Sequence, residues 1–206
     1  MRPVPMRRRC YRAACAAVLL AFASALPLAA QQPPDAAYTA RIREYTTEPF
    51  FLTRLVEYLP ASSTVPTPQE VLGHVVGQPD VLHYPEEIYR YMREVDEASD
   101  RVKVVSIGET EEGREMILVI VADEQTIANL GEQKANLAKL ADPRTTSEAE
   151  AQRLIATTKP IYWATGAIHA PETGSPEMLM ELVYRLAVDE SEHVRAIRDN
   201  LIFMAT

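Results

Sequence analysis

Residues 159–188, KPIYWATGAIHAPETGSPEMLMELVYRLAV, decide the fold of this chain. The apolar run Ile161–Ile168 predicts a β-strand, and the later part predicts a helix that begins near Ser175, a good N-cap residue. His169 and Glu172 lie in the polar turn between these two elements. A histidine at a strand end, followed three residues later by a carboxylate, can direct two metal-binding side chains to one point.

Further strands are expected on both sides of this segment. The runs Val102–Ile107 and Met116–Val121 are joined by a glycine-bounded polar turn and predict an antiparallel pair. The second run is apolar on both faces and should lie inside the sheet. Another apolar run, Leu201–Thr206, follows the helix, and a strand–helix–strand order implies a parallel pair with Ile161–Ile168. The sequence therefore predicts an α/β fold with a mixed, partly parallel sheet flanked by helices, and Trp163 is expected in its core.

Helix signals occupy most of the remaining chain. Capping boxes at Thr67–Glu70 and Ser147–Glu150 each precede apolar residues and indicate helix starts. Further helices are indicated by apolar spacing or by a polar, charged composition at 85–95, 127–140 and 191–198.

The first 30 residues have the layout of a secretory signal peptide. Five arginines precede the apolar run Ala13–Leu26, which is too short for a comfortable membrane span, and small residues lead up to Gln31. We expect cleavage after Ala30, no stable membrane anchor, and a secreted or periplasmic location. The predicted domain organisation is a signal peptide (1–30), an N-terminal arm and loop (31–66), and one domain (67–206).

The arm and loop at 31–66 begin with a proline-rich, polar stretch that shows no apolar period. An apolar cluster then follows around Phe50 and Phe51, which we expect to anchor in the core of the domain. It predicts one short helix or an extended piece lying on the domain.

Charge and cysteine content exclude several classes of partner. Removing the five N-terminal arginines changes the formal charge of the 206-residue chain from −8 to −13. Such an acidic protein is a poor candidate for binding nucleic acid or anionic membranes. Cys10 and Cys15 both lie in the predicted signal peptide, so the mature chain has no disulfide. Small molecules or peptides are therefore the expected partners.

The His169–Glu172 pair has two interpretations on spacing alone. Catalytic zinc takes three protein ligands of the histidine and carboxylate type and keeps a fourth position for water. A His-x-x-Glu turn can supply two of these ligands, here stiffened by Ala170-Pro171. Alternatively, His169 is a surface residue and Glu172 complements the dipole of the helix that follows.

Other polar residues are assigned structural roles. His193 is expected on the solvent face of a polar helix and is not proposed as a third ligand. His74 and His83 are expected to be surface or packing residues. Glu112 and Arg114 belong to a turn between two strands.

Three blocks in order carry a resemblance to a known family. Pro85–Tyr91 as a helix, the Ser106-to-Arg114 strand and turn, and the Gly166–Glu172 strand end together resemble the N-terminal half of a carboxypeptidase A-like zinc metallocarboxypeptidase. The resemblance covers about 67–206 and implies a mixed eight-stranded sheet flanked by helices. It also implies that His169 and Glu172 bind Zn²⁺, Glu172 through both oxygens.

The same resemblance places the remaining catalytic parts beyond Thr206. A third histidine ligand, the arginines and asparagine that bind the substrate carboxylate, and the general-base glutamate are all expected further along such a chain. The sequence also stops inside an apolar strand. We therefore expect a fragment that does not turn over substrate by itself.

The functional hypothesis is an exported zinc-dependent metallocarboxypeptidase, which hydrolyses peptides at their C-terminus with zinc-activated water. One alternative is an amidohydrolase or deacylase of the same fold. A second alternative is a non-catalytic exported binding domain that has lost the metal.

Overall fold

A computed structural model describes residues 32–206. The signal peptide predicted for residues 1–30 lies outside this range. Within the described range, every helix is too short or too polar to cross a membrane.

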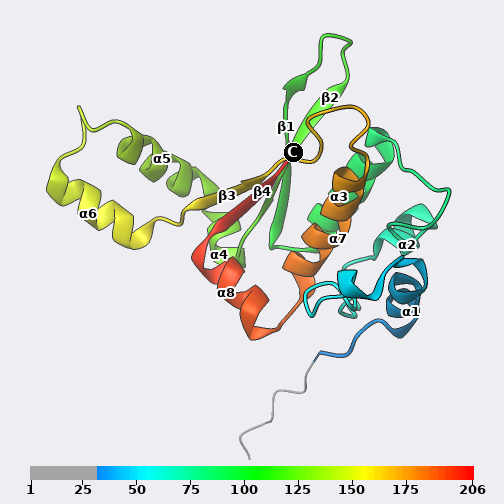
Figure 1. The fold of residues 1–206 in the computed structure, drawn as a ribbon. Coiled ribbons are helices and arrows are strands. Elements are labelled where there is room, and N and C mark those ends of the chain that lie inside the picture. Colours follow the sequence, from blue (N-terminus) through cyan, green and yellow to red (C-terminus); the bar gives the residue numbers. More distant parts are fainter. Residues whose placement is uncertain (1–31) are drawn as a thin grey trace, which may run out of the picture. The chain divides into compact units, whose positions relative to one another are not determined.

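The described residues form a mixed sheet with the strand order β1-β2-β4-β3 (Figure 1). The strands are β1 (Val102–Glu109), β2 (Glu115–Val121), β3 (Ile161–Ala164) and β4 (Ile202–Ala205). β2 pairs antiparallel with β1 and with β4, whereas β3 pairs parallel with β4. These pairings confirm the predicted class, the antiparallel β1–β2 pair, the interior place of β2 and the parallel crossover through a helix.

Helices flank the sheet, as predicted. They are α1 (Ala36–Tyr45), the 3-10 turn η1 (Pro49–Phe51), α2 (Pro68–Leu72), α3 (Pro85–Ala98), α4 (Glu124–Ala128), α5 (Leu130–Ala141), α6 (Glu148–Thr157), α7 (Gly174–Val188) and α8 (Glu192–Asn200). The capping box at Thr67 is present in full, and the hydroxyl of Ser147 caps α6.

The main core lies between the sheet and the pair α3 and α7 (Figure 1). Tyr91 and Val95 of α3 and Met180 and Val183 of α7 are fully buried there. Apolar residues at helical spacing place these side chains on one stripe of each helix, and burial of that stripe drives the packing. The two helices therefore cover one face of the sheet, and the turn that contains His169 and Glu172 leads from β3 into one of them, α7.

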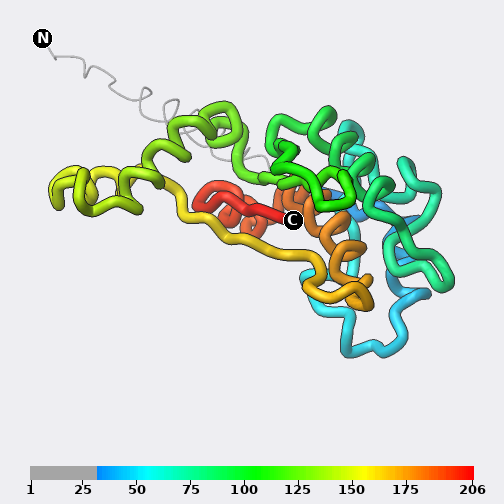
Figure 2. Tube along the Cα trace, turned by 90° about the horizontal axis from the view of Figure 1, so that it is seen from above, coloured from blue at the N-terminus to red at the C-terminus, as the bar shows by residue number. Residues whose placement is uncertain are grey.

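The opposite face carries a smaller apolar cluster. Ile120, Ala122 and Ile202 are buried there against Ile127 of α4 and Leu130 of α5. Beyond this cluster, α5 and α6 project away from the sheet as a hairpin, seen from two directions in Figures 1 and 2. Neither α5 nor α6 has a buried residue.

The strand predicted at Ile161–Ile168 is shorter in the structure. β3 ends at Ala164, and Ala167 adopts a left-handed φ of 65°, which turns the chain out of the sheet. The prediction that Trp163 lies in the core is wrong, because Trp163 is 59% exposed. β3 lies at an edge of the sheet, and its residues other than Ala164 are exposed, so the described residues leave the side chains of this strand largely uncovered.

The N-terminal arm also differs from its prediction. Residues 36–45 form α1, which begins at the side-chain cap Asp35 and buries only Tyr38 and Thr39, so no apolar period marks it. Phe50 and Phe51 are 73% and 56% exposed, which contradicts their predicted anchoring role. Tyr38 anchors this region instead, since its buried hydroxyl accepts a hydrogen bond from the Val76 N–H at 3.2 Å.

Candidate metal centre

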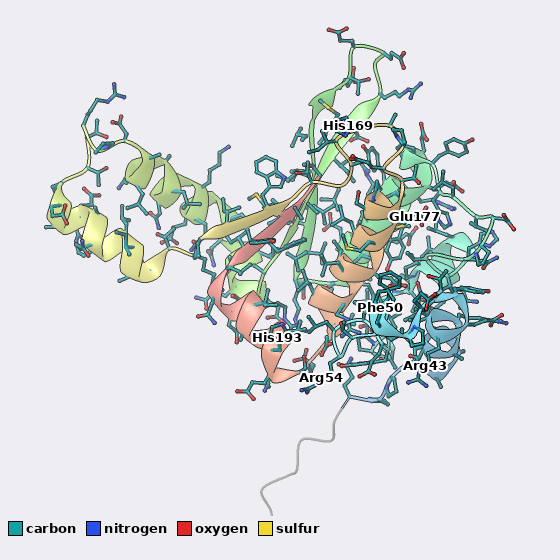
Figure 3. The ribbon with its side chains drawn as sticks, viewed as in Figure 1. Arg43, Phe50, Arg54, His169, Glu177 and His193 are labelled. Carbon is teal, nitrogen blue, oxygen red and sulfur yellow. The ribbon has the colours of Figure 1, made fainter. Side chains whose placement is uncertain are left out.

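His169 (Figure 3) and Glu172 lie in the turn that connects β3 to α7, at the carboxyl end of a parallel strand. The Glu172 N–H donates to the His169 carbonyl at 3.0 Å and closes the turn. Loops at the carboxyl ends of strands are where α/β folds build their sites.

The two side chains point at each other. The distance from His169 Nδ1 to Glu172 Oε1 is 2.7 Å, a hydrogen bond between the ring and the carboxylate. Glu172 Oε2 accepts from the backbone N–H groups of Ile168 and His169, at 2.9 and 3.1 Å. The His169 contact, followed by these two amide bonds, lowers the pKa of Glu172 below its ordinary value. The carboxylate is therefore ionised and oriented at neutral pH.

Two contacts join this turn to the rest of the fold. The Gly166 N–H donates to the Thr206 carbonyl at 2.7 Å, which continues the β3–β4 ladder by one bond. The Ala167 N–H donates to Ser175 Oγ at 2.9 Å. Ser175 was predicted as the N-cap, but α7 begins at Gly174 after Thr173 and the Ser175 hydroxyl binds the turn instead.

The donor atoms suit zinc, with two adjustments. Tetrahedral zinc with bonds of about 2.1 Å holds two donors about 3.4 Å apart, so the 2.7 Å contact has to lose its proton and open slightly. Glu172 Oε2 already accepts hydrogen bonds from two backbone amides. These two bonds would have to lengthen or break for Glu172 to bind zinc through both oxygens. Both side chains are exposed, at 73% for His169 and 50% for Glu172, which leaves room for both changes.

No cluster of three His, Cys, Asp or Glu side chains capable of holding a metal occurs within residues 32–206. His193 is exposed on α8, at the opposite end of the fold from His169 (Figure 3). Glu112 and Arg114 pair with each other at 2.9 Å on the exposed β1–β2 turn, as expected of turn residues.

One buried polar pair beside the turn was not predicted from the sequence. His83, in the loop before α3, is buried and contacts Glu177 in the first turn of α7. The two residues are 94 positions apart, and no local pattern connects them. The only local signal is helical spacing, because Glu177 lies three residues before the buried Met180 on the same side of α7.

Comparisons with known proteins come from a family model and a solved structure. The model "Zinc carboxypeptidase" matches residues 88–205. The crystal structure of carboxypeptidase A from Helicoverpa armigera is similar with a TM-score of 0.42 and 15% sequence identity. The match covers 67% of this chain and 29% of that carboxypeptidase. No curated protein matches.

The region matched by the family model runs from α3 through β4 and includes the turn with His169 and Glu172. It spans more than half of the 206 residues. The chain belongs to the zinc carboxypeptidase family.

Proposed function

We propose that this chain contributes two zinc ligands, His169 and Glu172, to an exported metallocarboxypeptidase that hydrolyses peptides at their C-terminus. One observation carries the proposal: the ring nitrogen and the carboxylate converge to 2.7 Å at the carboxyl end of β3, inside the region matched by the zinc carboxypeptidase model.

Neighbouring groups set the charge and the orientation of these two side chains. Because the pKa of Glu172 is lowered, its carboxylate carries a negative charge toward the bound cation at neutral pH. His169 presents Nδ1 once the proton shared with Glu172 leaves. The amides of Ile168 and His169 fix the orientation of the carboxylate through Oε2. Bound zinc would supply an activated water and polarise the scissile carbonyl.

The activity itself is proposed for a longer protein. Catalytic zinc takes three protein ligands, and residues 32–206 bring two together. The third ligand, the general base and the groups for the substrate carboxylate are expected after Thr206. Zinc should therefore bind this chain more weakly than a complete three-ligand site.

Metal binding by the chain tests the first part of the proposal. Equilibrium dialysis with Zn²⁺ at pH 7 should find one site in the wild type, and His169→Ala and Glu172→Gln should each remove it. His193→Ala is the matched control, because it deletes an exposed imidazole at the other end of the fold. Equal zinc binding by wild type and His169→Ala would contradict the assignment.

Substrate comparison tests the reaction. The protein extended beyond Thr206 should cleave a peptide with a free C-terminal carboxylate and leave the same peptide with an amidated C-terminus intact. Faster hydrolysis of N-acyl amino acids than of peptides would instead identify a deacylase. Zinc binding without hydrolysis of either class would indicate a binding domain.

Export is proposed from the layout of the first 30 residues. The mature protein recovered outside the cytoplasm should begin at Gln31, which N-terminal sequencing checks. Recovery of the intact Met1 terminus in the cytoplasm would contradict export.

A further inference from the structure

A buried His–Glu pair ties the loop before α3 to the start of α7. His83 Nδ1 lies 3.1 and 3.0 Å from the two carboxylate oxygens of Glu177, and the His83 N–H donates to Glu177 Oε1 at 2.7 Å. The side chains are only 3% and 9% exposed. Three contacts thus join segments that are 94 residues apart in the sequence.

The surroundings of the ring determine which nitrogen carries the proton. Nδ1 faces two acceptor oxygens, whereas Nε2 is buried and finds no hydrogen-bond partner within residues 32–206. A proton on Nδ1 satisfies the carboxylate, so the geometry assigns the Nδ1–H form. His83 then presents two donors, its backbone N–H and its ring N–H, to one carboxylate.

Glu177 lies directly after the turn that holds the two predicted zinc ligands. It lies in the first turn of α7, five residues after Glu172. Thr173, at the N-cap, makes no side-chain capping bond. Carboxylates in the first turn favour the helix N-terminus, and here that carboxylate is held in the core by His83. The start of α7 is therefore fixed from inside the fold.

The turn itself has few other attachments. The Ile168 and His169 amides bind Glu172 within the turn, and the Ala167 amide binds Ser175 at the start of α7. Apart from the Gly166 bond to Thr206, these hydrogen bonds connect the turn only to itself or to the first turn of α7. A shift of α7 at Glu177 would consequently move Ser175 and Glu172 together.

A second metal site does not explain the pair. The nearest other imidazole, His74, has its ring centroid 6.0 Å from that of His83, and the described residues contain no group of three metal-binding side chains. Stabilisation of the fold is also a weak explanation. A protein with a buried ionisable pair often has no higher free energy of unfolding than the same protein with apolar residues of similar volume in its place.

We propose that His83 is a positioning residue: through Glu177 it fixes the first turn of α7 and thereby the geometry of His169 and Glu172. This inference rests on the proposed role of these two residues as zinc ligands. Groups that hydrogen-bond directly to metal ligands change metal affinity by about 10- to 100-fold when removed, and His83, which acts through Glu177, should have an effect near the lower end of this range.

Zinc affinity measured by competition with a chromophoric chelator tests the inference. His83→Ala should weaken zinc binding by about tenfold, the lower end of the range for direct partners of metal ligands. His83→Asn should restore most of it, because the asparagine amide N–H can take the place of Nδ1–H. Glu177→Asp, which keeps the charge but retracts the carboxylate from His83, provides a variant from the other end of the pair should His83→Ala fail to fold. His74→Ala, the neighbouring imidazole, is the control and should bind as the wild type does.

Amide hydrogen exchange gives a second readout that does not need metal. In His83→Ala or Glu177→Asp, the amides of Ile168 and His169 should exchange faster than in the wild type, while the Val119 amide in β2 keeps its rate. A purely structural role would raise exchange at Val119 as well. Unchanged exchange at Ile168 and His169 would overturn the inference.

Zinc affinity and amide exchange together show whether the metal assignment or the positioning role of His83 is wrong. If the wild type and His169→Ala bind zinc equally, the metal assignment fails, and exchange alone decides whether His83 positions the turn. If His169→Ala abolishes zinc binding but His83→Ala and Glu177→Asp bind normally, the metal assignment stands and the positioning role is wrong.

Discussion

The carboxylate of Glu172 should titrate abnormally because of its local contacts. The His169 ring bond and two amide bonds favour the ionised form and lower its pKa. Any stability from this group is present above the unfolded-state pKa and is lost as pH falls through the lowered folded-state pKa. His169→Ala should move the pKa of Glu172 back toward its ordinary value, measured by NMR titration of the side-chain carboxyl carbon. His193→Ala should leave it unchanged, and an unshifted pKa in His169→Ala would contradict the prediction.

Glu181 in α7 should show the opposite behaviour. Burial raises its carboxyl pKa, although a Tyr38 hydrogen bond and the charge of Arg185 partly offset this, and Oε1 is buried without a hydrogen-bond partner within residues 32–206. Its stability contribution is complete below the unfolded-state pKa and is lost as pH rises through the raised folded-state pKa.

Thermal melting from about pH 4 to about pH 7 tests the role of Glu181. Relative to the wild type, Glu181→Gln should gain stability as pH rises, because the neutral amide does not ionise. Glu192→Gln, an exposed carboxylate on α8, should follow the wild-type profile. Parallel profiles for wild type and Glu181→Gln would disprove the prediction.

Residue patterns predicted side-chain contacts only where these are local in the sequence. His169 and Glu172 are three positions apart, so their spacing already implied the contact that the structure contains. His83 and Glu177 meet across 94 residues, and only the packing of α3 against α7 brings them together. Sequence spacing carries no information about such a pair.

The α5–α6 hairpin should be the first element that a protease attacks. Neither helix buries a residue, and the Arg144 side chain in the connection between them is 86% exposed. Exposed loop tips with few packing contacts open locally at little free-energy cost. Limited trypsin digestion should therefore cleave first after Arg144.

Two substitutions check the site of cleavage by mass spectrometry. Arg144→Gln should remove the first cut. Arg54→Gln, at another exposed arginine, should leave it in place. Early cleavage within α3 or α7 would contradict the view that the hairpin is the least stable element.

The type of most elements was predictable, but the burial of individual side chains often was not. Apolar runs identified β1, β2 and β4, and capping signals located α2 and α6. Trp163 of β3 was assigned to the core, yet this strand lies at an edge of the sheet and Trp163 is exposed. The composition of a strand does not show whether other segments of the chain cover its two faces.

The stability of the whole domain should depend on the layer between α7 and the sheet. Met180 is fully buried there, whereas Met178, two residues earlier, is 47% exposed. Met180→Ala should lower the free energy of unfolding by about 2–5 kcal/mol, because it removes buried methylenes and leaves a cavity. Met178→Ala should change it by roughly 0.5 kcal/mol or less. Urea unfolding measures both, and equal effects would contradict the proposed core.

The edge position of β3 has a consequence for how copies of the chain behave in solution. Its outer backbone groups have no partner strand within residues 32–206, and Ile161, Tyr162 and Trp163 are exposed beside them. An open edge rich in aromatic and β-branched residues is a template on which another strand can add. Concentrated samples should therefore aggregate into β-rich material, detected by light scattering and infrared spectroscopy. Tyr162→Lys should suppress this aggregation, because edge lysines are a common natural protection against strand addition.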